Sequence, residues 1–295
     1  MAEPDTEQAA AQAARPVPWA GGIWAQTRSA RAGAEDRPPA TKHSCGVILC
    51  RKGASGRPEV LLVRKRYTYA YAEFVHGRYS AGRGAAAARA VAPLLAQMTE
   101  EEIFDIWSLN YAQMWYRIWV SYDATEVYLK KAARFRAAFI DLDGGAALRE
   151  ALRRAPGRGA LLWEVPKGRH LSAREASLIC AVRELREETG VGVRDYALLP
   201  GVERRVAYVS DGVRYSVQYY GAIAHAHCAA APPRLPVRSE PRARSEVSGA
   251  RWFDVEQIRA VDAGAGRLEA LVRPVFEQAR RYWSGRWQGA GAPRV

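Results

Sequence analysis

Short apolar runs bounded by turn residues mark the strands of this chain, and they gather in two regions. The runs HSCGVILCRK at 43–52 and PEVLLVRKR at 58–66 are joined by GASGR and predict a β-hairpin. A second hairpin is predicted where residues 202–209 and 213–224 flank SDG. Two shorter runs predict single strands: LLWEV at 161–165 and RWF at 251–253.

Helical spacing of apolar residues dominates the segment between the first hairpin and LLWEV. That segment holds roughly a hundred residues, which is too long for a loop in a compact domain. Thr99 and Glu102 form a capping-box pattern at the start of a helix predicted in TEEEIFDIWSLNYAQMWYRIWV. Further helices are predicted at 128–139 and 146–154, and a closing helix at 266–283.

These elements predict an α/β fold interrupted by a helical insertion. We expect the α/β domain to comprise residues 42–77 and 159–283, with the insertion at 78–158. Residues 1–41 are rich in Ala, Pro, Gly and Arg and lack periodicity, so a disordered N-terminal tail is predicted there. Residues 284–295 are expected to form a C-terminal tail.

The charge of the chain adds an indication of its partners. A net charge of +13 and a pI of about 9.8 favour polyanions such as nucleic acid, inositol phosphates or an anionic membrane surface. An Arg-rich coding bias would give the same charge and stays open as an alternative. The four cysteines have no metal-type spacing, which fits a reducing compartment. No apolar run reaches the roughly 18 residues that span a bilayer, and the start MAEPDTEQ is too acidic for a secretory signal.

The strongest chemical signal is the stretch WEVPKGRHLSAREASLICAVRELREETGV at 163–191. Ser172 and Glu175 have capping-box spacing at the start of a predicted helix, and Gly190 is placed to end it. One apolar stripe is predicted on this helix, formed by Leu178, Ile179, Val182 and Leu185.

Three acidic residues, Glu184, Glu187 and Glu188, follow at i, i+3, i+4 on the face opposite that stripe, so their side chains are expected to converge. They lie at the negative end of the helix dipole, where carboxylates are disfavoured. Cations among them would relieve the repulsion, and hard oxygen ligands suit Mg²⁺ or Mn²⁺. The alternative is a solvated acidic face on which Arg183 and Arg186 are the counter-charges.

This stretch closely resembles the box of the Nudix hydrolase family, G-x5-E-x7-R-E-U-x-E-E-x-G-U, in which U is an apolar residue. Its fixed positions are matched by Gly168, Glu175, Arg183, Glu184, Leu185, Glu187, Glu188, Gly190 and Val191. Six residues rather than five separate Gly168 from Glu175, which leaves two roles for Glu175 open, helix cap and metal contact. The resemblance implies an α/β/α sandwich around a mixed sheet, and hydrolysis of a nucleoside diphosphate linked to another group.

The resemblance also implies roles for individual residues. Glu184 is the expected base for the attacking water, and Arg183 is expected to position a neighbouring group. The expected ligands of Mg²⁺ or Mn²⁺ are Glu175, Glu184, Glu187 and Glu188, with Asp211 in the SDG turn and Glu246 before the last strand as further candidates. Ordinary turn chemistry and a solvated loop are the alternatives for these last two.

The segments RYTYAYAEFVHGRYS at 66–80 and MWYRIWV at 114–120 are similar to the Nudix decapping enzymes of large DNA viruses. This resemblance implies a viral enzyme of the host cytoplasm that cleaves the 5′ cap of mRNA and releases 7-methylguanosine diphosphate. It implies that Tyr69 and Tyr219 clamp the cationic base between their rings. The alternative is that both are ordinary aromatics of the sheet. Lys167 and Gly168 are expected to contact the substrate.

Basic residues of the insertion are expected to bind the body of the RNA. They are Lys130, Lys131, Arg134 and Arg136, and their contact with the RNA backbone would not depend on sequence. A plain solvated face is the alternative. Two other functions stay open: hydrolysis of diphosphoinositol polyphosphates or free nucleoside diphosphate derivatives, and RNA binding without catalysis.

Overall fold

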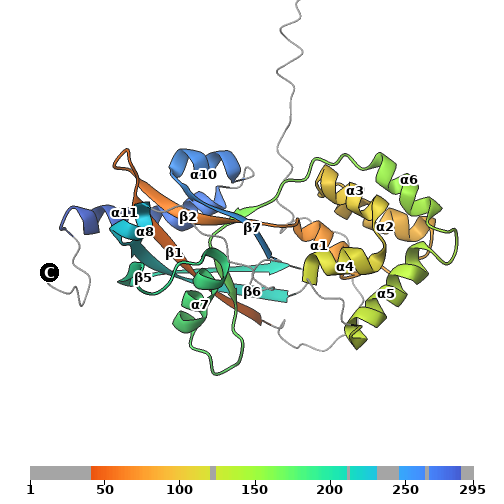
Figure 1. Cartoon of the computed structure of the whole chain (residues 1–295), viewed down its shortest axis with the longest axis horizontal. Helices are drawn as coiled ribbons and strands as arrows, with labels where there is room; N and C mark the ends of the chain where they lie inside the picture. The colour runs from red at the N-terminus through yellow and green to blue at the C-terminus, as the bar shows by residue number, and fades with distance from the viewer. Residues whose placement is uncertain (1–40, 120–123, 211–212, 231–245, 263–265, 287–295) are drawn as a thin grey trace, which may run out of the picture.

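A computed structural model describes residues 41–119, 124–210, 213–230, 246–262 and 266–286 (Figure 1). Its centre is a seven-stranded sheet with the order β3-β2-β1-β6-β5, in which β4 also pairs with β1 and β7 with β2. The strands are β1 Thr41–Lys52, β2 Pro58–Lys65, β3 Trp163–Glu164, β4 Lys167–Arg169, β5 Tyr196–Ser210, β6 Val213–Ala224 and β7 Val247–Phe253. β1 runs parallel to β6 and antiparallel to β2 and β4, so the sheet is mixed, as predicted.

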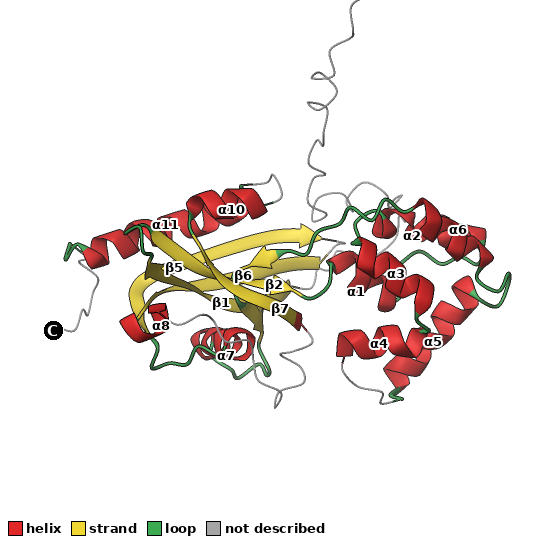
Figure 2. Cartoon of the chain, turned by 45° about the horizontal axis from the view of Figure 1, so that its top comes forward, coloured by secondary structure: helices red, strands yellow, loops and turns green. Residues whose placement is uncertain are grey.

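Helices cover both faces of this sheet (Figure 2). They are α7 Ser177–Thr189 on one face, α10 Val255–Val261 and α11 Arg267–Trp283 on the other, and the short α8 Ala226–Ala230 after β6. Val47 and Leu49 of β1 pack with α7, whereas Ile48 and Cys50 pack with α10 and α11. Successive side chains of a strand point to opposite faces, so β1 is apolar on both and is buried between the two helical layers. The α/β/α sandwich is thereby confirmed.

The other helices gather at one end of the sheet (Figure 1). They are α1 Tyr69–Val75, α2 Ala85–Leu95, α3 Glu100–Ser108, α4 Tyr111–Trp119, α5 Glu126–Phe139 and α6 Ala146–Arg154. We call α1 to α6 the helical cluster. Helices α5, α6 and α11 confirm the predictions at 128–139, 146–154 and 266–283. Both predicted hairpins are confirmed as well. The predicted strand LLWEV is shorter than expected, because only its residues Trp163 and Glu164 form β3. Most of the predicted tails lie outside the described residues.

One helix was predicted after Thr99, and the structure has two, α3 and α4. The break follows from a second pair of capping interactions. Asn110 Oδ1 accepts the N–H of Gln113 at 3.0 Å, and Gln113 Oε1 accepts the N–H of Asn110 at 2.9 Å. Because these side chains satisfy N–H groups at the start of a helix, they begin α4 as a separate element.

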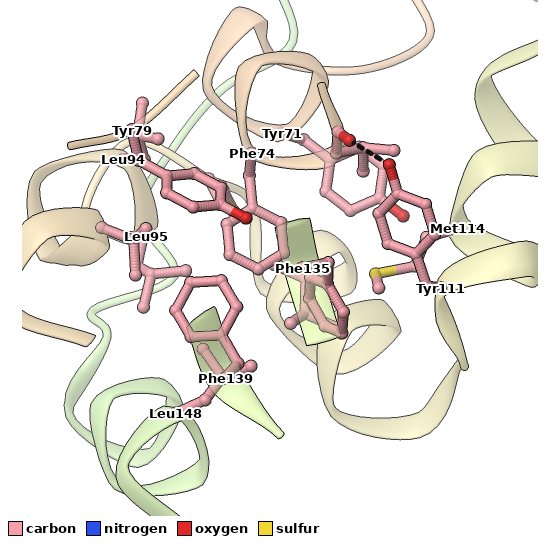
Figure 3. Packing of buried hydrophobic residues seen from close by; sticks show 14 of the residues in the cluster. Tyr71, Phe74, Tyr79, Leu94, Leu95, Tyr111, Met114, Phe135, Phe139 and Leu148 are labelled. Carbon is pink, nitrogen blue, oxygen red and sulfur yellow. Dashed lines mark hydrogen bonds between the residues drawn. The ribbon is translucent and has the colours of Figure 1, made fainter. Parts of the chain in front are cut away.

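The helical cluster has its own aromatic core, shown in Figure 3. The rings of Phe74 on α1 and Phe139 on α5 have centroids 5.7 Å apart, and Tyr111 on α4 donates from its hydroxyl to Val75 O at 2.7 Å. Residues of α1 therefore pack with the later helices rather than beneath the sheet, although the sequence placed them in the α/β part. No helix among the described residues combines the length and the apolar content that crossing a membrane requires.

Glu102 joins the start of α3 to the start of α1. Its carboxylate accepts from the backbone N–H and the hydroxyl of Thr68, at 2.6 and 2.8 Å, and from the N–H of Thr99 at 3.0 Å. The predicted capping box of Thr99 and Glu102 is confirmed. Glu102 is only 4% exposed, so its bonds to Thr68 also tie the connection from β2 to the helical cluster.

We expect Glu102→Ala to lower the free energy of unfolding by about 2–4 kcal/mol, because three partly or fully buried donors lose their acceptor. Urea denaturation measures the change. The control is Glu101→Ala, which removes an exposed carboxylate from the same helical turn and should cost less than about 0.5 kcal/mol. A loss no larger than that of the control would contradict the anchoring role of Glu102.

Candidate active site

Helix α7 carries most of the predicted site, but it packs through a different stripe from the one predicted. Cys180, Ala181 and Leu185 are buried against the sheet, whereas Ile179 is 60% exposed. The sequence pattern favoured the larger apolar residues, while the small side chains of Cys180 and Ala181 fit the close approach of the helix to β1. This rotation puts Glu188, 3% exposed, on the buried side of α7. The three acidic residues therefore do not share one solvent-facing surface.

The ends of α7 confirm one prediction and correct another. Gly190 ends the helix as predicted, with a φ of 72° in the left-handed region. The helix begins later than predicted, and Ala176 at its N-cap makes no side-chain capping bond. Ser172 and Glu175 are therefore not its capping box. The carboxylate of Glu175 turns instead towards Arg183.

Arg183 connects three carboxylates. Its Nε lies 2.9 Å from Glu175 Oε1, and its Nη1 lies 2.8 Å from Glu184 Oε1 and 3.0 Å from Glu187 Oε2. Nη2 also donates to the backbone oxygen of Arg169 at 2.8 Å. The hydrogen bond from Arg183 lowers the pKa of Glu175. One guanidinium thus holds three mutually repelling acids beside the loop before α7, and its positioning role in catalysis stays a prediction.

Glu184 lies against the backbone of Gly168. A Cβ at position 168 would lie 2.1 Å from Glu184 Cδ and 2.2 Å from each carboxylate oxygen, so a side chain there cannot coexist with this position of the acid. Burial raises the pKa of Glu184, although the hydrogen bond from Arg183 opposes the shift. A raised pKa makes a carboxylate held in this way a better proton acceptor.

Glu188 points towards Lys65 of β2. Its Oε2 accepts the backbone N–H of Lys167 at 3.0 Å, while its buried Oε1 has no hydrogen-bond partner and lies 3.6 Å from Lys65 Nζ. Burial raises the pKa of Glu188 to about 7, and the charge of Lys65 acts against that rise.

The acids of α7 are farther apart than their spacing predicted. Among the described residues, Glu184, Glu187 and Glu188 do not place one oxygen each within 4.8 Å of the other two. Arg183 draws two of them to one side and Lys65 attracts the third. Their chemistry still fits a hard divalent cation, because all three are carboxylates and Glu188 Oε1 keeps an unused lone pair.

Lys65 and Glu164, which border these acids, were missed by the sequence reasoning. Glu164 Oε1 lies 3.1 Å from Lys65 Nζ, and Glu164 Oε2 lies 2.6 Å from Lys167 Nζ. Burial disfavours the ionised form of Glu164, but the two lysines outweigh it and lower the pKa of Glu164 to about 2. Glu246, a candidate metal ligand, lies at this border, with its Oε2 3.7 Å from Lys65 Nζ. The other candidate, Asp211, lies outside the described residues. The available signal was a charged residue beside a short apolar run in each case, Lys65 after VLLV at 60–63 and Glu164 within LLWEV at 161–165.

The predicted pair of aromatic rings is only partly available to a ligand. Tyr69 is 47% exposed, and its hydroxyl donates to Glu164 Oε2 at 3.1 Å; the charge of Glu164 raises the pKa of Tyr69 to about 12. Tyr219 is 6% exposed within the core, so its ring offers little surface to a ligand.

Tyr208 on β5 is 38% exposed, and the sequence reasoning missed it. Burial raises the pKa of Tyr208, and the charges of Lys167 and Glu164 shift that pKa in opposite directions.

The predicted RNA-binding residues of α5 fall into two groups. Burial and the neighbouring charge of Arg134 lower the pKa of Lys131, which indicates that positive charges are crowded there. Lys130 is exposed beside Lys131 and Arg134. Arg136 lies apart, with its Nε 2.8 Å from the carboxylate of Asp141. The structure thus brings together three of the four.

Comparison with known proteins identifies the family. The NUDIX domain model matches residues 118–276, which is over half of the chain. The chain therefore belongs to the Nudix family and is a Nudix hydrolase.

Two viral relatives align along most of this chain. It is 32% identical over 243 residues to the mRNA-decapping protein g5R of African swine fever virus, isolate Pig/Kenya/KEN-50/1950, covering 82% of this chain and 97% of that protein. The g5R protein of isolate Warthog/Namibia/Wart80/1980 is 32% identical over 245 residues, with coverage of 82% and 97%. A structure of C. elegans Ap4A hydrolase shares 13% identity at a TM-score of 0.40, covering 83% of this chain and 98% of that one, and is too distant to bear on activity.

Proposed function

We propose that this Nudix hydrolase cleaves the 5′ cap of mRNA in the cytoplasm of an infected host cell and releases 7-methylguanosine diphosphate. The named activity of the African swine fever virus relatives supports this proposal. One observation carries it: the exposed ring of Tyr69 is linked through Glu164 and Lys167 to Glu188 of α7. A flat cationic base can stack on such a ring while its phosphate chain reaches the acids and lysines.

The residues of the site divide the chemistry between them. The proposed ligands of Mg²⁺ or Mn²⁺ are Glu184, Glu187 and Glu188, with Glu175, Asp211 and Glu246 as further candidates. When bound, such an ion neutralises charge on the phosphates and lowers the pKa of water. Glu184 accepts the proton of the attacking water, and Arg183 keeps its carboxylate in place. Lys65 and Lys167 present ammonium groups to the phosphate oxygens.

Hydrolysis of diphosphoinositol polyphosphates is the second candidate. The crowded cations around Lys131 favour a polyanion. The same residues, with Lys130 and Arg134, are the proposed contacts to the body of the RNA. An inositol polyphosphate has no flat base, so its binding would not need the ring of Tyr69.

Tyr69→Ala is expected to raise KM for capped RNA by about tenfold or more, because stacking of a base on an aromatic ring contributes roughly 1–3 kcal/mol. The rate constant kcat should change little, and turnover of diphosphoinositol pentakisphosphate should not change. The assay uses cap-labelled RNA and the inositol substrate in parallel, with Mn²⁺ present. Tyr69→Phe is the matched control, because it keeps the ring and loses only the hydroxyl bond to Glu164.

The outcomes separate the candidate functions. An equal loss on both substrates would argue against stacking on Tyr69. Turnover of the inositol substrate alone would favour the second candidate. Tight RNA binding with no turnover of either substrate would favour an RNA-binding module without catalysis.

A further inference from the structure

Two buried cysteines and a histidine meet beside the start of α7. They are Cys45 on β1, Cys180 on α7 and His170, which directly follows β4. Their ligand atoms all lie within 4.8 Å of one another, and Cys45 Sγ is 3.7 Å from His170 Nε2. The two cysteines are 1% and 0% exposed. In the part of the chain that the structure describes, no other three metal-ligating side chains lie so close together.

The fold builds this group from distant segments. β1 and β4 pair antiparallel with Cys45 opposite Gly168, so His170 leaves the strand end close to Cys45. Helix α7 packs on the same face of β1 and adds Cys180. Because 125 positions separate Cys45 from His170, the spacing of cysteines along the chain does not reveal the group.

The geometry fits a soft divalent ion. Zn–S bonds of about 2.3 Å and Zn–N bonds of about 2.0–2.1 Å put tetrahedral ligands roughly 3.5–3.8 Å apart. The 3.7 Å between Cys45 Sγ and His170 Nε2 already has this length. Ser177 Oγ, 3.3 Å from His170 Nε2, offers an oxygen beside the group.

The charges also fit. Two thiolates and a neutral imidazole cancel the charge of a divalent ion, so the loaded site is neutral and suits a buried position. Arg183 Nη2, 3.6 Å from Cys180 Sγ, would further stabilise a thiolate there.

We propose that Cys45, His170 and Cys180 bind one Zn²⁺-like soft ion, at a site separate from the carboxylates of α7. The ion would join β1, the loop after β4 and the first turns of α7. β4 carries Gly168 and α7 carries Glu184. The ion would therefore hold together the two elements whose contact sets the position of the Glu184 carboxylate. Mg²⁺ and Mn²⁺ prefer oxygen ligands, so the two sites select different metals.

Titration of the metal-free full chain with Co²⁺ tests this site. We expect the charge-transfer absorption of a cobalt–thiolate bond and the intense d–d bands of tetrahedral Co²⁺, saturating at one equivalent and displaced by Zn²⁺. Cys180→Ala should abolish the charge-transfer absorption, or leave it far weaker. His170→Ala changes a less buried residue and should weaken the binding of Co²⁺ without harming the fold, which circular dichroism checks. Cys228→Ala, outside the group, and Glu187→Gln, in the carboxylate site, should both retain the parent spectrum.

Absence of the charge-transfer band from the parent chain would overturn the proposal, as would an unchanged band in Cys180→Ala. A disulfide between Cys45 and Cys180, detected as thiols that resist alkylation after denaturation without reductant, would also overturn it. Failure of cap hydrolysis would leave the outcome unaffected, because the bands report an ion at the thiolates rather than turnover.

Discussion

Glu184→Gln is expected to slow the release of labelled 7-methylguanosine diphosphate by about 10²- to 10⁴-fold while leaving the chain folded. An amide has nearly the size of a carboxylate, so the contact with Gly168 is kept, but it cannot take the proton from water. The loss should appear in single-turnover assays with Mn²⁺ and cap-labelled RNA. Fluorescence anisotropy should show that the variant still binds the RNA.

The matched control is Glu277→Gln on α11, which changes an exposed glutamate on the opposite face of the sheet from α7. It should hydrolyse the cap like the parent chain. If Glu184→Gln were as active as this control, Glu184 could not be the base, and the proposed mechanism would fail.

Gly168→Ala is expected to reduce cap hydrolysis by about 100-fold, because a displacement of the reacting group by about an ångström has costs of this order. The added Cβ would overlap the carboxylate of Glu184, the mobile end of a side chain, so the acid moves while the backbone stays. Thermal unfolding should therefore change by only a few degrees, and kcat should fall far more than affinity for the RNA.

Two further variants isolate the cause. Gly192→Ala adds a Cβ with an ordinary contact of 3.5 Å to Asp195 Oδ2, and it should leave activity near the parent level. In a Glu184→Ala background, Gly168→Ala should have no additional effect on residual activity, because the displaced side chain is absent. A full additional loss in that background would show that Gly168 acts through something other than Glu184.

The central architecture was predictable because its signals are local. The two faces of β1 are covered by helices, so its residues form an apolar run that marks a strand, and the Nudix box marks α7 with its C-terminal glycine. The rotation of α7 was not predictable in this way. Hydrophobicity favoured Ile179, whereas close packing selected Cys180 and Ala181, and this choice decides that Glu188 faces Lys65.

The charged border of the site depends on strand pairing. Lys65 and Glu164 meet because β2 and β3 pair, with Val63 opposite Glu164. About a hundred residues separate Lys65 from Glu164 along the chain, so only the pairing of the two strands brings them together. Alternation along β6 likewise indicates which face Tyr219 occupies but not how deeply it lies. The structure shows that Tyr219 is covered and that Tyr208 is the more open ring.

The anchoring of Thr68 by Glu102 has a consequence for the position of Tyr69. Thr68 immediately precedes Tyr69, so the backbone that carries the ring proposed to meet the base is fixed to the first turn of α3, while the hydroxyl of that ring bonds to Glu164 of β3. Tyr69 therefore bridges the helical cluster and the sheet. The packing where these two parts meet thereby sets where a stacked base would lie relative to the acids of α7.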